Sequence, residues 1–155
     1  MANIEDCNFP DDLYYDAENL MWLTFEDDGT VKCGLTDVGQ FIAGSLLYVT
    51  PRKLGYKAKK GKRVAIIESG KYVGPIKAPL TGEITDLNPK VLKDTGSAKL
   101  VNEDPYGEGW ILKIKPAKLD EEKDSLLTGD AAMDALKERM ARDDWNCREH
   151  KGAQA

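Results

Sequence analysis

A lysine at the tip of a predicted hairpin constrains this chain more than any other feature. Residues 64–79 contain an apolar run rich in β-branched residues, then Ser69-Gly70-Lys71, then a second run with valine and isoleucine. Two such runs around a short polar break predict a β-hairpin whose two-residue loop is Gly70-Lys71. Glycine at the first central position favours a type II′ turn, because that position needs a positive φ. Lys71 is therefore expected to hold its ammonium group in water.

The residues around this hairpin carry a family resemblance. Most exposed lysines only make a surface more soluble, so Lys71 alone indicates little. The chain, however, contains several motifs in a fixed order: Gly34–Gln40, Glu68–Lys71, Ile76–Ile84 and Leu100–Trp110. Together they resemble the glycine cleavage system H protein family, over roughly residues 22–140. The resemblance implies a carrier protein rather than an enzyme.

The resemblance also implies a covalent cofactor. In that family a hairpin lysine carries lipoate through an amide bond, which here places the lipoyl group on Lys71. Glu68 lies three residues before this lysine and Gly82 eleven after it, as in the family. Four residues are thereby implied in ligase recognition or in presenting the lysine: Glu68, Ser69, Gly70 and Gly82. Gly82 fits an ordinary turn glycine equally well. Biotin carriers bracket their lysine with methionines, where this chain has Gly70 and Tyr72, so lipoate is expected.

Departures from the glycine-cleavage pattern bear on the pathway. Those H proteins have valine before the lysine and alanine after it, where this chain has Gly70 and Tyr72. Their His-x-Trp is Leu20-Met21-Trp22 here. The Gly70-Lys71-Tyr72 form, the acidic stretch 9–14 and the cysteine-containing tail are more similar to the H-protein-like lipoate-binding proteins of bacterial sulfur oxidation. That resemblance implies a lipoyl arm that shuttles a sulfur-bound intermediate toward oxidation to sulfite.

The partners implied are a lipoate–protein ligase or lipoyl synthesis enzymes, a heterodisulfide-reductase-like complex and dihydrolipoamide dehydrogenase. Two alternatives stay open. One is an H protein of glycine cleavage that carries the aminomethyl group, and the other is an unmodified H-like adaptor.

Cysteine and histidine usage indicates no catalytic or metal site. Cys7, Cys33 and Cys147 are widely spaced without a C-x-x-C, which predicts neither a disulfide framework nor zinc binding. Cys33 alternates with a valine in a predicted strand and is expected to be a small buried hydrophobe. Cys147 and His150 are three residues apart, which we interpret as incidental. Since His150 is the only histidine, most acid–base and metal sites are excluded.

Charge and hydropathy narrow the function classes further. A net charge of −5 argues against nucleic-acid binding, which normally uses a basic face. No apolar run approaches the roughly 20 residues that span a bilayer, and the acidic N-terminus does not look like a secretory signal. We therefore expect a cytoplasmic monomer that binds neither nucleic acid nor membranes. The basic run 57–63 is interpreted as a solvated connection, with an acidic partner as the alternative.

Short strands separated by turn signals predict a mainly β fold. Strands are expected at residues 20–25, 30–35, 46–49, 82–87 and 109–115, besides the hairpin. Many short strands with little helix argue for a sandwich or small barrel. The resemblance sharpens this to a barrel-sandwich hybrid of the lipoyl/biotinyl type.

Two helices are predicted. A short one covers 37–43, capped by Thr36 and closed by Gly44. A second covers 131–142, with Asp130 as its cap and an apolar stripe of Met133, Leu136 and Met140. We thus expect a flexible arm over 1–12, a lipoyl-carrier domain over 13–142 that includes this helix, and a polar tail over 143–155.

Overall fold

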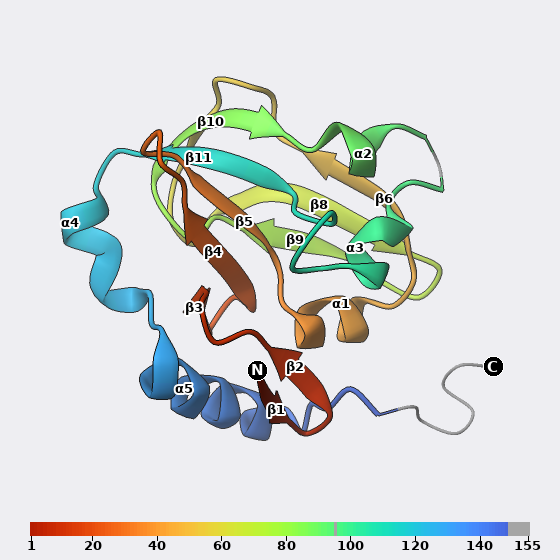
Figure 1. The fold of residues 1–155 in the computed structure, drawn as a ribbon. Coiled ribbons are helices and arrows are strands. Elements are labelled where there is room, and N and C mark those ends of the chain that lie inside the picture. The colour runs from red at the N-terminus through yellow and green to blue at the C-terminus, as the bar shows by residue number, and fades with distance from the viewer. Residues whose placement is uncertain (95, 149–155) are drawn as a thin grey trace.

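Strands dominate the chain (Figure 1). The computed structural model describes residues 1–94 and 96–148. It contains a two-stranded sheet (β1-β2), a three-stranded sheet (β6-β8-β9) and a six-stranded sheet in the order β3-β4-β5-β11-β10-β7. The strands are β1 (Ala2–Ile4), β2 (Cys7–Phe9), β3 (Tyr14–Asp16), β4 (Met21–Phe25), β5 (Val31–Leu35), β6 (Leu46–Pro51), β7 (Lys57–Ala58), β8 (Arg63–Ser69), β9 (Val73–Lys77), β10 (Gly82–Leu87) and β11 (Leu112–Pro116).

Helices are short except for the last one. They are α1 (Asp37–Ala43), α2 (Pro89–Leu92), α3 (Lys99–Glu103), α4 (Leu119–Glu122), the 3₁₀ turn η1 (Lys123–Ser125) and α5 (Gly129–Arg142). The bounds of α1 confirm the prediction, and the Thr36 hydroxyl accepts the Gly39 N–H at 3.2 Å as its cap. α5 begins at Gly129, so Asp130 lies in the first turn and is not the cap.

The main core lies between the three-stranded and six-stranded sheets. Both sheets contribute fully buried aliphatic side chains to one continuous cluster, including Leu23, Leu46, Val64, Ile84 and Ile114. Alternation along the strands places these residues on the inner faces. The predicted barrel-sandwich arrangement is thereby confirmed. β11 starts three residues later than expected, since 109–111 still belong to the connection from α3.

A second core corrects the expectation for the N-terminus. The sequence predicts a loosely held arm over residues 1–12, but β1 and β2 form an antiparallel hairpin beside α5 and below α1 (Figure 1). Cys7 and Phe9 are completely buried there, together with Leu136 and Met140 of α5. Burial of these apolar side chains outweighs the polar composition of the segment.

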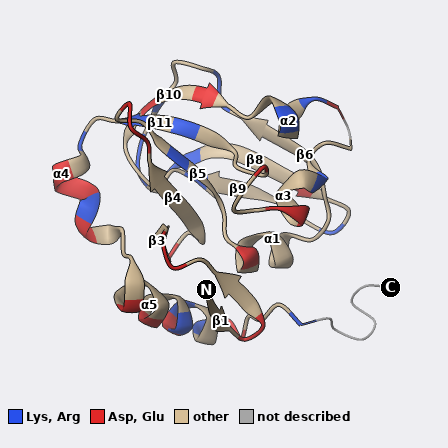
Figure 2. Cartoon of the chain, in the orientation of Figure 1, with Lys and Arg blue, Asp and Glu red and all other residues tan. Residues whose placement is uncertain are grey.

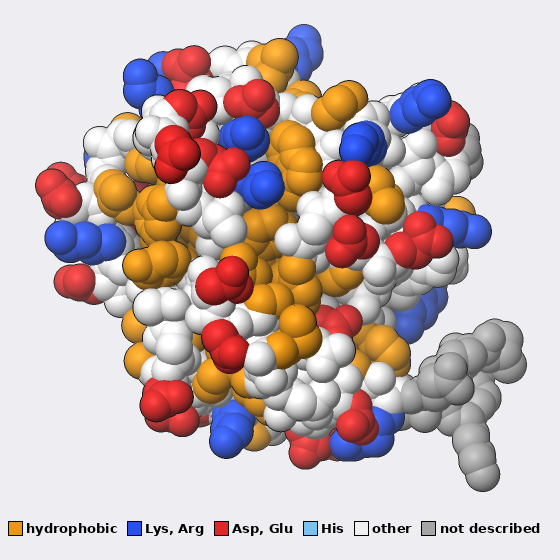
Figure 3. Space-filling model, in the orientation of Figure 1, with side chains coloured by type: hydrophobic (Ala, Val, Ile, Leu, Met, Phe, Trp, Pro, Cys, Tyr) orange, Lys and Arg blue, Asp and Glu red, His pale blue; other side chains and the backbone are white. Residues whose placement is uncertain are grey.

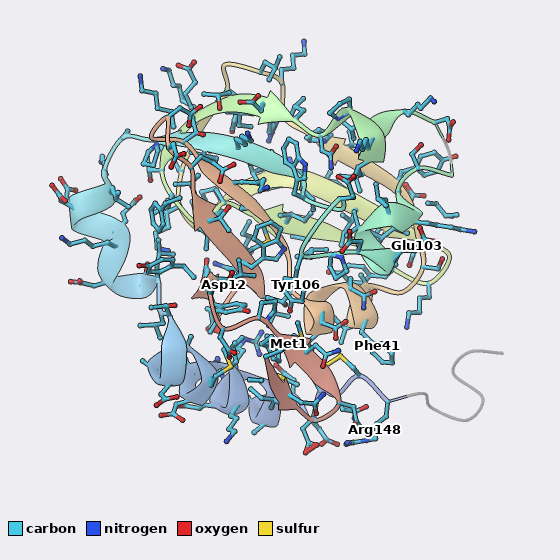
Figure 4. All side chains as sticks on the ribbon, viewed as in Figure 1. Met1, Asp12, Phe41, Glu103, Tyr106 and Arg148 are labelled. Carbon is cyan, nitrogen blue, oxygen red and sulfur yellow. A yellow bond between two sulfur atoms is a disulfide. The ribbon has the colours of Figure 1, made fainter. Side chains whose placement is uncertain are left out.

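The expectation that the cysteines form no disulfide framework is also corrected. Cys7 and Cys147 form a disulfide with their Cα atoms 5.0 Å apart, seen as a yellow bond between the N-terminal hairpin and the C-terminal segment (Figure 4). The partners are 140 residues apart in sequence, and only the return of the chain after α5 brings them together. Cys33 is buried and free, as predicted. His150 lies outside the described residues, so its spacing from Cys147 stays untested.

Hydrogen bonds from the segment 104–110 connect the N-terminal hairpin to α1 and to the six-stranded sheet. The Tyr106 hydroxyl donates to the Asn8 carbonyl at 2.6 Å and accepts the Asp37 N–H at 2.8 Å, so it joins β2 to α1 (Figure 4). Trp22 donates its indole N–H to the Pro105 carbonyl at 2.8 Å. One of the family motifs thus has a structural role.

The surface carries charges of both signs. α4 is acidic and is followed by a lysine in η1, and α5 carries both acidic and basic side chains (Figure 2). In the view of Figure 3 hydrophobic side chains gather near the centre of the face. The basic run contributes β7 and the start of β8, and Lys57 pairs with Glu83 at 2.7 Å. None of the helices in residues 1–94 and 96–148 combines the length and apolar character needed to cross a membrane.

Candidate functional site

The predicted hairpin is present, with Lys71 in its loop. β8 and β9 pair antiparallel up to Glu68 opposite Val73, and the Ser69 N–H donates to the Tyr72 carbonyl at 2.8 Å. The loop lies at the right-hand edge of Figure 1. Its predicted turn type is wrong, because Gly70 does not have a positive φ. The Ser69 hydroxyl accepts the Lys71 N–H at 3.3 Å, so a side-chain contact helps to shape a turn that needs no left-handed residue.

Ser69 also attaches the loop to α1. Its side chain is buried, and its hydroxyl donates to the Ala43 carbonyl at the end of that helix, at 2.7 Å. The buried Ser69 hydroxyl therefore both donates and accepts a hydrogen bond, as buried polar groups in folded proteins normally do. The loop backbone therefore has a fixed position relative to α1.

Lys71 is exposed, and its stem lies over α1. A Cβ added to Gly44 would lie 2.6 Å from Lys71 Cε and 3.4 Å from both Cδ and Cγ. Across the described residues, the lysine makes one polar contact, through its backbone N–H, and its ammonium has no partner. Converting this amine to an amide would remove a charge without breaking an ion pair. The site therefore fits an amide-linked group such as lipoate.

Glu68 stands next to the loop on the outer face of the sheet. It lies in one cross-strand row with Tyr48 and Val73, and all three side chains are exposed. Tyr72 is exposed by 42% and folds back over Gly74. A protein that approaches Lys71 would meet this mixed apolar and acidic row. The role of Glu68 in ligase recognition stays a prediction.

Gly82 is not brought to the loop. It lies in β10, in the six-stranded sheet, where it pairs with Ala58 and Pro116. A Cβ there would come within 2.1 Å of the Lys115 carbonyl oxygen, so glycine permits the close approach of β11. This gives Gly82 a packing role, while its part in ligase recognition stays a prediction.

A cavity of about 460 Å³ lies beside the hairpin. It is bounded by α1, by β9 with Tyr72, by the turn 18–20 and by residues of the C-terminal region. Arg139 stacks on Trp145, with its guanidinium 4.4 Å from the ring centre, and pairs with Glu18 at 2.8 Å. The adjacent Arg142 holds the pKa of Glu18 below its usual range through a hydrogen bond. No local pattern in the sequence indicates that Trp145 lines a cavity beside this hairpin.

The site presents the primary amine of Lys71 to solvent. Burial raises the pKa of the Cys33 thiol to about 12, which leaves it protonated and unreactive at neutral pH. Within residues 1–94 and 96–148, no group of three or more histidine, cysteine or acidic side chains is placed to hold a metal ion.

Comparison with known proteins gives a consistent result. The family model described as glycine cleavage H-protein matches residues 13–139. The chain is 46% identical over 145 residues to glycine cleavage system H protein 2 of Aquifex aeolicus, covering 94% of this chain and 88% of the relative. It is 41% identical over 150 residues to probable glycine cleavage system H protein 2 of Sulfurisphaera tokodaii, covering 96% and 99%.

A solved structure shares the fold. The crystal structure of a glycine cleavage system H protein from Mycobacterium marinum superposes with a TM-score of 0.68 at 27% identity. The likeness covers 88% of this chain and 99% of that one. The sheets, the hairpin and the sequence motifs therefore all point to one family.

Proposed function

This chain belongs to the glycine cleavage H-protein family, and from that premise we propose that it carries lipoate on Lys71. The chain is a carrier and not a catalyst. One observation carries the proposal for the site: an exposed primary amine, without an ionic partner in the described structure, sits on a loop whose backbone is fixed to α1. A modifying enzyme needs such access, and a carrier needs such a rigid base.

Lipoate would supply a dithiolane on Lys71, with its redox and thiol-transfer chemistry. The protein holds the point of attachment. Ser69 fixes the loop, Gly44 leaves room for the lysine stem, and the exposed row with Glu68 offers a surface next to the amine. A tether on a fixed base keeps its end at high local concentration near a docked enzyme.

The proposed partners are enzymes that add or use the lipoyl group. A lipoate–protein ligase or lipoyl synthesis enzymes would act on Lys71, and dihydrolipoamide dehydrogenase would reoxidise the arm. The exposed Tyr72 and Val73 beside the lysine support a contact surface there, since aromatic side chains are enriched at interfaces.

For the pathway, the comparisons favour glycine cleavage over sulfur oxidation. The matching family model and the relatives named above all carry glycine cleavage in their descriptions. We therefore place participation in glycine cleavage first, which reverses the order that the residues beside Lys71 suggested.

Sulfur oxidation with a heterodisulfide-reductase-like complex remains the second candidate, on two observations. Gly70 and Tyr72 flank the lysine where partner enzymes must make contact. In addition, three of the relatives are H proteins numbered 2, 3 and 5 of a single organism, Aquifex aeolicus. Several H proteins in one cell are consistent with carriers that serve different partners.

Acylation of Lys71 is tested by incubating the protein with lipoate, ATP and a lipoate–protein ligase, followed by intact mass spectrometry and peptide mapping. We expect one lipoyl group, located on Lys71. Lys71→Arg should abolish it, whereas Lys77→Arg, an exposed lysine on the same hairpin, should not. An unmodified wild-type protein in this assay and in the native host would support the adaptor alternative.

The pathways are separated by offering the lipoylated protein to purified glycine decarboxylase and, in parallel, to a heterodisulfide-reductase-like complex. Efficient turnover with glycine decarboxylase alone would exclude the sulfur candidate. Turnover only with the second complex would place sulfur oxidation ahead of glycine cleavage.

A further inference from the structure

Gly44 lies directly beneath the carrier lysine. It follows the last residue of α1, and the carbons Cγ, Cδ and Cε of Lys71 all lie within 3.4 Å of the position that a Cβ of residue 44 would take. The nearest of these distances, 2.6 Å to Cε, is too short for two carbon atoms. Only a residue without a side chain therefore permits this path of the lysine stem.

We propose that Gly44 is a positioning residue for Lys71, held in place by Asn102, and that it sets the direction in which the acylated lysine leaves the protein. The proposal rests on the function proposed above, in which Lys71 bears the lipoyl group. Gly44 lies outside the hairpin and 27 residues before the lysine in sequence.

Asn102 of α3 fixes the end of α1 on which the lysine rests. Its side-chain amide donates to the Gly44 carbonyl at 2.8 Å and to the Gln40 side-chain oxygen at 2.8 Å. Its side-chain oxygen accepts the Leu46 N–H, also at 2.8 Å. These three contacts hold the chain on both sides of Gly44. A half-buried asparagine with its donors and acceptor used in this way immobilises the segment.

The same segment is tied to the hairpin from the other side. The Ser69 hydroxyl donates to the Ala43 carbonyl, and the Gly44 N–H returns to the carbonyls of Gln40 and Phe41 at 3.1 and 3.3 Å. The surface beneath the lysine and the loop that carries the lysine are therefore one connected unit. A side chain at residue 44 would therefore displace the lysine stem, because the backbone on both sides of the contact is held in place and the stem is the part that can move.

Direction matters because the lysine must enter enzymes docked nearby. A fixed base with a defined exit angle raises the fraction of arm conformations that reach a docked active site. A methyl group on residue 44 would push Cε aside and send the amine along another path. We therefore expect slower acylation of Lys71 and slower reduction of the lipoyl arm, by more than the loss of folding stability explains.

The chain offers a matched control for this test. Gly44 has φ +86°, so Gly44→Ala strains the backbone as well as contacting the lysine. Gly55 has φ +85°, and a Cβ there would meet no atom within 4 Å. Gly55→Ala therefore also places an alanine at a positive φ, at a remote position and without the steric contact, and Tm measures the backbone strain of each variant separately.

The experiment measures kcat/KM for ligase-catalysed lipoylation of wild type, Gly44→Ala and Gly55→Ala, together with Tm. We expect both variants to lose Tm, kcat/KM to fall about tenfold or more in Gly44→Ala, and kcat/KM to stay unchanged in Gly55→Ala. Equal kcat/KM in the two variants would overturn the proposal. If Gly44→Ala does not fold, Asn102→Asp serves as the second variant. It loses the donors to Gly44 and Gln40 but keeps an acceptor for the Leu46 N–H. We expect Asn102→Asp to lower kcat/KM as well, and an unchanged kcat/KM would overturn the proposal.

A second measurement needs no variant and no ligase. In the unmodified wild-type protein, nuclear Overhauser contacts are expected between the Lys71 Hε and the Gly44 Hα protons. Their absence would contradict the packing of the stem on Gly44, regardless of what Lys71 carries. If instead the contacts are present but wild type is not acylated on Lys71, the proposed function fails while the packing of the stem stands.

Discussion

In the loop between β8 and β9 the backbone is held in place, while the lysine ammonium has no partner in the described structure. By contrast, residues 5–7 are joined to residues 147 and 148 through their side chains. In the loop, one serine hydroxyl makes the contacts to α1 and to the lysine N–H. At the ends, the Cys7–Cys147 disulfide, ion pairs of Arg148 with Glu5 and Asp6, and the second apolar core hold β1, β2 and α5 together.

This difference indicates that stability and carrier chemistry reside in separate regions. A side chain that has to be modified and visited by enzymes gains from having few contacts. The ends need many contacts, because a two-stranded hairpin of three-residue strands is not stable alone. Solvent screens these exposed ion pairs and leaves them little net effect, so the disulfide and the apolar burial must contribute most of the stabilisation.

Removing the disulfide should therefore have the largest effect on stability. Cross-linking residues 140 apart restricts the unfolded chain strongly, and we expect Cys7→Ser/Cys147→Ser to lower the free energy of unfolding by about 3–5 kcal/mol. Urea titrations of the oxidised protein, the reduced protein and the double variant would measure this. Reductant should not affect the double variant, and an oxidised protein no more stable than its reduced form would contradict the comparison.

The second apolar core should contribute next. Leu136 is completely buried between α5 and the N-terminal hairpin, and Leu136→Ala is expected to cost about 2–5 kcal/mol through lost transfer energy and a residual cavity. The neighbouring Lys137 is exposed, so Lys137→Ala should change stability by less than about 0.5 kcal/mol. Similar values for the two variants would mean that α5 does not depend on this core.

Local signals in the sequence were sufficient for most of the carrier domain. The hairpin, α1 with its Thr36 cap and the longer strands of the two larger sheets follow from alternation, turn residues and capping, which act over a few positions. The short strands β3 and β7 were not predicted. The resemblance of the motifs pointed to Lys71, and the structure places it in the expected loop.

The remaining features depend on contacts between distant segments. The disulfide joins residues 140 apart, Trp145 follows α5 yet lines the cavity beside the hairpin, and Asn102 meets Gly44 across 58 positions. None of these produces a periodic or local pattern. The expectation of a flexible N-terminal arm failed for the same reason, since strands of three residues are stabilised by α5 and the disulfide rather than by their own composition.

Gly82 tests the separation between residues that stabilise the fold and residues that serve the carrier lysine. It packs within the six-stranded sheet, although the family resemblance associates it with Lys71. Gly82→Ala forces a methyl group against the Lys115 carbonyl and should cost about 1–3 kcal/mol by overpacking. Denaturant titration and lipoylation kinetics of the same samples would separate its two roles. Loss of acylation in a variant that remains fully folded would favour ligase recognition, whereas a loss that follows the unfolded fraction would favour packing.

Lys71→Ala should have the smallest effect on stability and the most complete effect on function. The side chain is exposed and its ammonium has no partner in the described part of the chain, so we expect the free energy of unfolding to change by less than about 0.5 kcal/mol. The stem lies on the flat surface of Gly44, and truncating it buries no polar group and opens no interior cavity. Acylation, measured by intact mass, should be lost entirely. A loss of about 2 kcal/mol or more would show that the lysine is part of the scaffold, and the separation of stability from carrier chemistry would no longer hold.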